Sequence, residues 1–279
     1  MLAIDRVTLC PSILVQVAGS HCQRRLAAGF QFKGAAMKRT FDANALKVIA
    51  IIAMTIDHIA WVLFPGYDYG AVPIVLHIIG RVTCPIMCYF IAEGFHHTKN
   101  VARYTRRLFL FALLSHFAYV FFSKNFVDWK SFIPFYYGDL LDQTSVMWSL
   151  AWGLVMLRVA YSPKMRDPVK YILIIGICLI TLPGDWSCIA SLCILAFGTN
   201  RQNFKKQMLW MVFYVAIYSA VYCFAMDPVY GILQMAVVLA IPILGMYNGK
   251  RGYSPNILKY AFYLYYPLHL FILGWLQAV

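Results

Sequence analysis

Charged residues are scarce in this chain. Only 13% of its 279 residues are Asp, Glu, Lys or Arg, whereas 62% are hydrophobic. Soluble globular domains carry about 25% charged residues, so this composition excludes a soluble globular domain. It is typical of a polytopic membrane protein.

Motifs for metal, phosphate or disulfide chemistry are also missing. The sequence contains no Cys-x-x-Cys pair, no Gly-rich phosphate loop, no zinc-type spacing and no fixed-period repeat. Most of the eight cysteines, among them Cys84, Cys88, Cys178, Cys193 and Cys223, fall within apolar runs, where a thiol behaves as a small apolar group. We therefore expect no metal site.

Long apolar runs, by contrast, are abundant. A helix needs about 20 apolar residues to cross a bilayer, and this pattern recurs between short polar breaks. We predict an all-α integral membrane bundle of about nine transmembrane helices. The apolar runs cover residues 47–64, 74–93, 107–123, 144–161, 169–183, 186–199, 207–225, 229–247 and 258–277. The fifth and sixth are short, which predicts either a re-entrant hairpin or two tilted helices.

Lys and Arg collect at alternate breaks between these runs, which indicates the topology. The five basic clusters are Lys38, Arg39 and Lys47; Lys99, Arg103, Arg106 and Arg107; Arg158, Lys164, Arg166 and Lys170; Arg201, Lys205 and Lys206; and Lys250, Arg251 and Lys259. We expect these breaks to be cytoplasmic, with the C-terminus outside, in a bacterial cytoplasmic membrane. The net charge of +13 does not indicate a nucleic-acid partner, because the cations are divided among five loops.

Residues 1–36 do not fit the pattern of the rest. They carry one brief apolar patch without the order of charge, apolar core and cleavage site that a signal peptide shows. We expect either a disordered leader or an extension ahead of the true start at Met37, followed by a single membrane domain over residues 37–279. A mass of the intact protein that includes residues 1–36 would contradict a start at Met37.

Ionisable residues inside the apolar runs are the candidates for function, because such residues are costly at membrane depth. Asp57 and His58 stand side by side in "MTIDHIAWVLFP". At a rise of about 1.5 Å per residue, His58 lies roughly 16 Å beyond Lys47. Eleven residues are close to three whole turns, so both side chains are expected on one helix face.

Other runs place polar groups at similar depth. These are Arg81 in the second run, His116 in the third and His269 in the ninth, while Glu93 reaches the cytoplasmic boundary. Burying an Arg and an Asp-His pair without a partner is expensive, which predicts a polar pocket between the helices.

Two further expectations concern the partners of single side chains. The side chain of Asp57 points about 100° away from His58 around the helix, so it is not assumed to orient His58 and is a candidate to pair with Arg81. His77, His96 and His97 are interpreted as histidines that bond to neighbouring carbonyl groups.

Three stretches resemble one known family. "LKVIAIIAMTIDHIAWVLFP", "IGRVTCPIMCYFIAEGFHHTKNVARYTRRLFLFALLS" and "KYAFYLYYPLHL" are similar to the TraX family of membrane proteins, whose named member is a pilin acetylase. The resemblance covers the chain from Met37 onward. TraX proteins in turn resemble the acyltransferase-3 group, in which a basic residue, ten intervening positions and a His occur in the first core helix. Lys47 and His58 have that spacing, with Lys where the wider group typically has Arg.

The resemblance implies transfer of an acyl group from cytoplasmic acetyl-coenzyme A to a hydroxyl or amine that arrives from outside, on a glycan or a peptide. His58 is then expected to act as general base and Arg81 to stabilise the oxyanion. His269 or His116 is expected to assist the proton relay. A covalent acyl-His intermediate stays open.

The donor's phosphates imply a basic clamp at the cytoplasmic rim. Lys47, Arg103, Arg106 and Arg107 are expected to bind the donor, with Glu93 at the same boundary. The pantetheine arm spans on the order of 15 to 20 Å when extended, which matches the roughly 16 Å depth of His58.

Two other classes of function stay open at this point. A secondary transporter would use Asp57, His58 and Glu93 as a proton pathway. A non-catalytic scaffold would help to assemble a surface structure. The aromatic loop over residues 123–144 is interpreted either as a platform for a sugar or peptide acceptor or as an interfacial aromatic belt.

Overall fold

The computed structural model describes residues 39–124, 129–133, 143–253 and 256–278, and the backbone of these residues is almost wholly helical. The elements are α1 (Ala43–Leu63), α2 (Ala71–Gly80), α3 (Thr83–His97), α4 (Val101–Lys124), η1 (Trp129–Phe132), α5 (Val146–Ala160), α6 (Asp167–Thr181), α7 (Ser187–Thr199), α8 (Phe204–Ala225), α9 (Pro228–Leu233), η2 (Gln234–Leu239), α10 (Ala240–Gly245) and α11 (Asn256–Ala278). The expectation for residues 1–36 lies outside the described residues.

The predicted fold class is confirmed. Within the described ranges, α2 with α3 and α9 with η2 and α10 each make one composite segment, so the helices form the nine apolar segments that the sequence predicts. Five segments are long and apolar enough to cross a membrane: Ala43–Leu63, Ala71–His97, Val101–Ser123, Phe204–Ala225 and Pro228–Gly245. The chain is thus a polytopic helical membrane protein.

The second predicted span is not one continuous helix. It divides into α2 and α3, with Arg81 and Val82 in a turn between them. Pro85 explains the break, because it lacks the N–H that would bond to the carbonyl of Arg81 in an unbroken helix. Pro is tolerated in the first turn of a helix, and Pro85 stands there in α3.

The eighth predicted span is irregular in the same way. A 3-10 stretch, η2, separates α9 from α10 and begins at Gln234. Pro242 follows in α10, where it removes the donor for the carbonyl of Val238. A 3-10 segment inside a span often marks a functional position.

The fifth and sixth predicted spans are two separate helices. α6 and α7 pack against each other across the short connection 182–186. At the end of this connection, Trp186 and Ser187 have φ angles of 62° and 48°. Positive φ is strained for residues other than glycine, so this turn is held by its surroundings.

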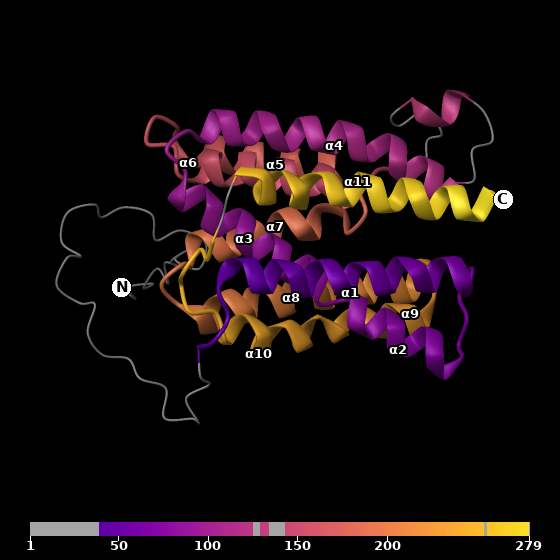
Figure 1. Ribbon diagram of the computed structural model, residues 1–279. Helices are drawn as coiled ribbons and strands as arrows, with labels where there is room; N and C mark the ends of the chain where they lie inside the picture. The colour runs from indigo at the N-terminus through magenta and orange to yellow at the C-terminus, as the bar shows by residue number, and fades with distance from the viewer. Residues whose placement is uncertain (1–38, 125–128, 134–142, 254–255, 279) are drawn as a thin grey trace, which may run out of the picture. The chain divides into compact units, whose positions relative to one another are not determined.

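The helices that carry the predicted site lie side by side. α1 packs against α2, α3 and α11, and α11 runs along α4 (Figure 1). α1 and α2 lie close together at Gly80, where an added Cβ would lie 2.3 Å from the Cβ of Asp57. Glycine is therefore required for α2 to approach the acid on α1.

Gly80→Ala is expected to lower the melting temperature in detergent, because the new methyl group overpacks the α1–α2 contact at a cost of roughly 1 to 3 kcal/mol. Gly176→Ala on α6 is the matched control, since a Cβ there meets nothing within 4 Å. The control is expected to melt at the same or a slightly higher temperature. Equal melting temperatures for the two variants would contradict the close contact.

Candidate functional site

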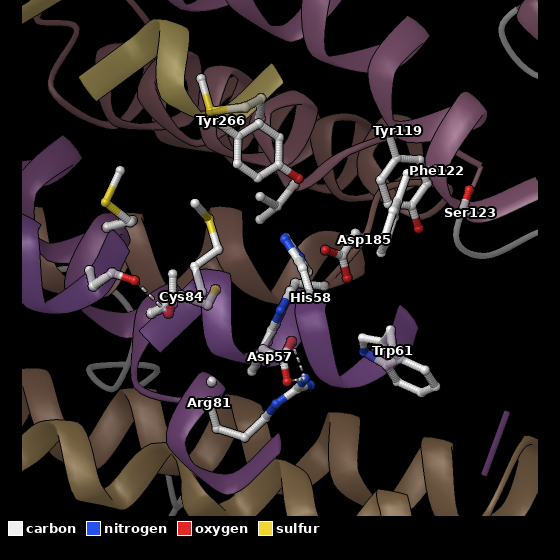
Figure 2. Close-up of a pocket in the computed structure, with 18 of the residues that line it drawn as sticks. Asp57, His58, Trp61, Arg81, Cys84, Tyr119, Phe122, Ser123, Asp185 and Tyr266 are labelled. Carbon is white, nitrogen blue, oxygen red and sulfur yellow. Dashed lines mark hydrogen bonds and ion pairs between the residues drawn. The ribbon is translucent and has the colours of Figure 1, made fainter. Parts of the chain in front are cut away.

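A buried ion pair joins the first two spans. Nη2 of Arg81 donates to both carboxylate oxygens of Asp57 at 2.9 Å (Figure 2). The two side chains are 12% and 11% exposed. The residues around the α2–α3 break thus carry the counter-charge for the acid on α1, and the pairing that the sequence suggested is present.

His77 completes this ion pair, and its interpretation as a carbonyl-bonding histidine is wrong. The ring is fully buried and its Nδ1 lies 2.8 Å from Oδ1 of Asp57. Because the carboxylate accepts, Nδ1–H of His77 donates. His77 precedes Arg81 by four residues, so one helical turn brings both onto the same face of the chain.

Arg81 has further partners besides the acid. Its Nη1 donates to Oε1 of Gln234 at 2.9 Å, and its Nε points to the carbonyl of His77 at 3.4 Å. The guanidinium carbon also lies 5.6 Å from the ring centroid of Trp186. A guanidinium has five N–H donors, and at most four have acceptors among the described residues. At least one donor therefore stays available.

His58 forms a second pair with His269. Nδ1 of His58 lies 2.7 Å from Nε2 of His269, whose Nδ1 donates to the carbonyl of Tyr265 at 2.9 Å. With both rings neutral, His269 must accept at Nε2, so His58 donates from Nδ1. Nε2 of His58 is left as a lone-pair nitrogen, and no group in the described part of the chain hydrogen-bonds to it.

Both pairs adjoin one cavity of about 620 Å³, although His77 and His269 themselves do not line it. Asp57, His58 and Arg81 all line it (Figure 2). In one direction along α1 the wall reaches Phe262 and Tyr263 at the start of α11. In the other it reaches the α1–α2 connection and the end of α8. His58 therefore faces a passage that extends toward both ends of the first helix.

Two of the expected donor-binding cations adjoin the first of these ends. Nζ of Lys47 lies 5.6 Å from the centroid of Phe262, and the guanidinium of Arg107 lies 5.1 Å from that of Tyr263. Nε of Arg107 is buried and has no hydrogen-bond partner among the described residues. A buried donor without an acceptor suits an anionic ligand.

The other two expected cations, Arg103 and Arg106, are exposed on the first turns of α4. By sequence spacing, only Arg103, which is four residues before Arg107, lies on the same face of α4 as Arg107. Their part in donor binding stays a prediction.

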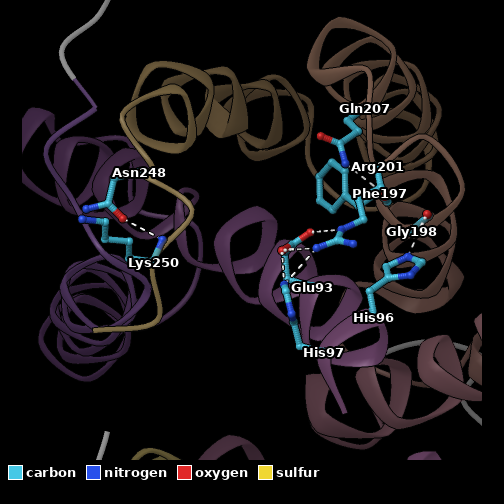
Figure 3. Close-up of polar contacts among 9 residues, drawn as sticks. All are labelled: Glu93, His96, His97, Phe197, Gly198, Arg201, Gln207, Asn248 and Lys250. Carbon is cyan, nitrogen blue, oxygen red and sulfur yellow. Dashed lines mark hydrogen bonds and ion pairs between the residues drawn. The ribbon is translucent and has the colours of Figure 1, made fainter. Parts of the chain in front are cut away.

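Glu93 lies in a separate cluster at the end of α3. Its Oε1 accepts from Nε of Arg201 at 2.9 Å, and its Oε2 lies 3.2 Å from Nε2 of His97 (Figure 3). The hydrogen bond with Glu93 raises the pKa of Arg201. Nε2 of His96 lies 3.1 Å from the carbonyl of Gly198, which confirms its interpretation as a carbonyl-bonding histidine, whereas His97 instead contacts charged groups.

His116 does not line the cavity. Its Nδ1 lies 3.1 Å from Oγ1 of Thr144 and its Nε2 lies 3.2 Å from the carbonyl of Phe132. This imidazole joins α4 to two points of the aromatic loop over residues 123–144, Phe132 and Thr144. Most of that loop lies outside the described residues.

Sequence reasoning missed two members of the site, His77 and Gln234. His77 carried a usable signal, because it stands one turn from Arg81. Gln234 had a weaker one, as a single amide in the run "YGILQMAVVLAIPILG". In the described part of the chain, no group of three His, Cys, Asp or Glu residues is placed to hold a metal ion.

Together these features define a polytopic helical membrane protein with an ion pair and a histidine pair at one internal cavity. Comparison with known protein families identifies one family within this class. The family described as TraX protein matches residues 42–277, and the chain belongs to the TraX family.

Two relatives extend this comparison. The chain is 30% identical over 250 residues to the probable fimbrial assembly protein FimC, serogroup H1, of Dichelobacter nodosus, covering 85% of this chain and 97% of the relative. It is 31% identical over 104 residues to the uncharacterized protein RP591 of Rickettsia prowazekii (strain Madrid E), covering 37% of this chain and 38% of that protein. No solved structure matches the chain.

Asp57→Asn is expected to destabilise the protein by about 3 to 5 kcal/mol, because Arg81 then lacks its counter-charge. Adding Arg81→Gln should recover part of the loss, so the two effects will not add. Thermal unfolding in detergent measures both. Asp167→Asn removes a pair with Lys170 in which the carboxylate is 56% exposed, and it should cost no more than about 1 kcal/mol. Additive losses at Asp57 and Arg81 would contradict a coupled pair.

Proposed function

We propose that this protein is a membrane-embedded acyltransferase that moves an acyl group, most simply acetyl, from acyl-coenzyme A to a hydroxyl or amine acceptor. The observation that carries this proposal is His58, which lines the cavity while its Nδ1 is held by His269 and its Nε2 has no hydrogen-bond partner among the described residues. An oriented, neutral imidazole in a cavity is the usual arrangement of a general base.

The donor enters from the end that Lys47 and Arg107 adjoin. Phosphates of coenzyme A bind Lys and Arg side chains through charge-assisted hydrogen bonds, and the Nε of Arg107, which has no partner in the described part of the chain, offers one such donor. Lys47 lies over Phe262, which itself lines the cavity. The pantetheine arm then follows the cavity to His58, a path of roughly 16 Å along the helix.

The acceptor reacts at His58. Nε2 takes the proton from the acceptor hydroxyl or amine while the acceptor atom forms a bond to the acyl carbon. The resulting tetrahedral intermediate expels the coenzyme A sulfur as the C–S bond breaks. The imidazolium returns its proton to the thiolate, so that free coenzyme A and the acylated acceptor leave and His58 is neutral again.

His269 and Arg81 support this chemistry in different ways. The imidazolium that forms at His58 donates more strongly to His269, which the carbonyl of Tyr265 holds in the accepting tautomer. Arg81 has an N–H donor that no acceptor among the described residues uses, which is free to bind the oxyanion, and Asp57 balances the charge of Arg81.

The topology and the relatives support a proposed location and biological setting. The basic end of the cavity is assigned to the cytoplasmic side of a bacterial cytoplasmic membrane, and the acceptor end to the outer side. The name of the Dichelobacter nodosus relative points to fimbriae, so the acceptor is a component or a glycan of a surface structure. The same name favours a scaffold without catalysis as the second candidate.

His58→Ala is expected to abolish acetyl transfer, with a loss of about 100-fold or more, because the base that takes the acceptor proton is removed. The measurement is release of free coenzyme A by purified protein in detergent, followed with a thiol reagent. His97→Ala is the matched control, since this histidine is 64% exposed and contacts Glu93 outside the cavity.

The same assay separates the candidates. Equal coenzyme A release from the wild type, His58→Ala and a blank preparation would reject the enzyme and favour the scaffold. Loss of release in both histidine variants would show instead that the assay reports folding.

A further inference from the structure

Two cysteines on neighbouring helices lie side by side, although ten positions separate them in the chain. Cys178 is in the last turn of α6, and Cys188 is in the first turn of α7. A side-chain hydrogen bond joins their thiols. Both are free cysteines, and both are only half-buried. The fold thus brings together two thiols that the sequence spacing does not pair.

The packing of α6 on α7 gives separate support for this contact. Cys178 of α6 and Leu192 of α7 pack against one apolar cluster, which contains Met156 of α5. Leu192 follows Cys188 by four residues, so the two side chains lie on the same face of α7. The face of α7 that carries Cys188 is therefore the face that meets α6.

The connection between the two cysteines is held by hydrogen bonds to a third segment. The amides of Gln143 and Thr144 donate to the carbonyl of Pro183 at 2.8 and 3.2 Å. The amide of Asp185 donates to the carbonyl of Thr144 at 2.8 Å. The path of residues 182–186 is therefore set by other contacts, and a bond between the two sulfurs does not require the chain to change its course.

A second thiol contact differs from this one. The Sγ atoms of Cys84 and Cys88 lie 3.8 Å apart on α3. Cys88 is fully buried, and its thiol donates to the carbonyl of Ala190 at 3.5 Å. A buried thiol is inert to oxidants in solution, whereas a partly exposed one reacts. The pair on α6 and α7 is therefore the better candidate for oxidation.

The proposed topology puts this pair near the outer side of the membrane. Residues 182–186 contain no Lys or Arg, whereas one basic cluster around Arg166 precedes α6 and another around Arg201 follows α7. Because basic breaks stay in the cytoplasm, the connection between α6 and α7 is assigned to the outer side. The bacterial periplasm is an oxidising compartment, in which disulfides form and persist.

We propose that Cys178 and Cys188 form a disulfide bond that holds residues 182–186 in place at the cavity. Two S–H bonds break and one S–S bond forms. The two electrons and two protons pass to the disulfide of a thiol–disulfide exchange protein, which becomes a dithiol. The inference goes beyond the proposed function, because it depends on the topology and not on acyl transfer.

The segment between the two cysteines contributes to the cavity wall. Asp185 and Trp186 both line the cavity. Trp186 and Ser187 also have φ angles of 62° and 48°, a backbone conformation that is costly for residues other than glycine. A cross-link removes alternative conformations of the loop that it closes. The disulfide therefore opposes relaxation of this strained turn away from the cavity.

The bond is tested on the full-length protein, purified from membranes in which free thiols have first been blocked with N-ethylmaleimide. The protein is digested with chymotrypsin, with and without reduction, and the peptides are identified by mass spectrometry. Chymotrypsin cuts after Trp186, so Cys178 and Cys188 lie on separate peptides unless a disulfide joins them. We expect a joined pair of peptides that reduction separates.

Two variants accompany the wild type. Cys178→Ser should lose the joined peptides and leave Cys188 carrying N-ethylmaleimide. Cys223→Ser is the matched control, because Sγ of Cys223 donates to the carbonyl of Pro228 at 3.4 Å and that variant should keep the joined peptides. If Cys178→Ser fails to fold, the wild-type digest alone decides.

The effect on the connection is measured by hydrogen–deuterium exchange of residues 182–188. Exchange is expected to be about tenfold slower in the oxidised protein than after reduction with dithiothreitol, because the cross-link opposes local opening. Cys223→Ser should show the same difference as the wild type.

Two results would overturn the inference. N-ethylmaleimide on both Cys178 and Cys188 of the isolated wild type would show that the bond does not form. Equal exchange rates before and after reduction would show that the bond does not hold the connection. Neither measurement uses coenzyme A, so a missing disulfide leaves the acyltransferase proposal intact, and a failed transfer assay leaves the disulfide intact.

Discussion

The ion pair between Asp57 and Arg81 is the contact on which the rest of the structure depends. An isolated charge inside an apolar bundle costs several kcal/mol, so each of these groups must reach its partner. The pair requires α2 to lie directly on α1, and Arg81 also donates a hydrogen bond to Gln234 of η2. Both irregular spans therefore change their helical geometry where they contribute a side chain to this network. Backbone that departs from the α-helix at membrane depth is tolerated where protein surrounds it or a cavity adjoins it, and both conditions hold here.

The fold followed from composition and periodicity to a large extent. Nine apolar segments were predictable because each crossing needs a run of similar length. The pairing of Asp57 with Arg81 was also within reach, since neither charge is stable alone at that depth and Asp57 faces away from His58. The interruption at Arg81 had a signal in Pro85, but hydropathy alone does not register a missing N–H group.

The finer arrangement of the site was beyond the sequence for physical reasons. His77 and His116 are both histidines in apolar runs. The spacing of His77 from Arg81 is a hint of the ion pair, but packing decides that His77 contacts Asp57 and that His116 contacts Thr144. The pairing of His58 with His269 joins the first and last helices, and no local rule specifies which of several histidines at similar depth will meet. The strained turn at Trp186 is likewise set by tertiary contacts, because tryptophan has no intrinsic preference for left-handed backbone.

The lack of space for a side chain at Gly80 also limits how the cavity can be redesigned. The α1–α2 wall has no free space behind Asp57, so neither a larger nor a differently shaped residue fits there without separating the two helices. The opposite wall carries Tyr119 and Phe122 from α4, large rings that smaller residues can replace. Smaller residues at these two positions would enlarge the cavity and leave the contact between Gly80 and Asp57 unchanged.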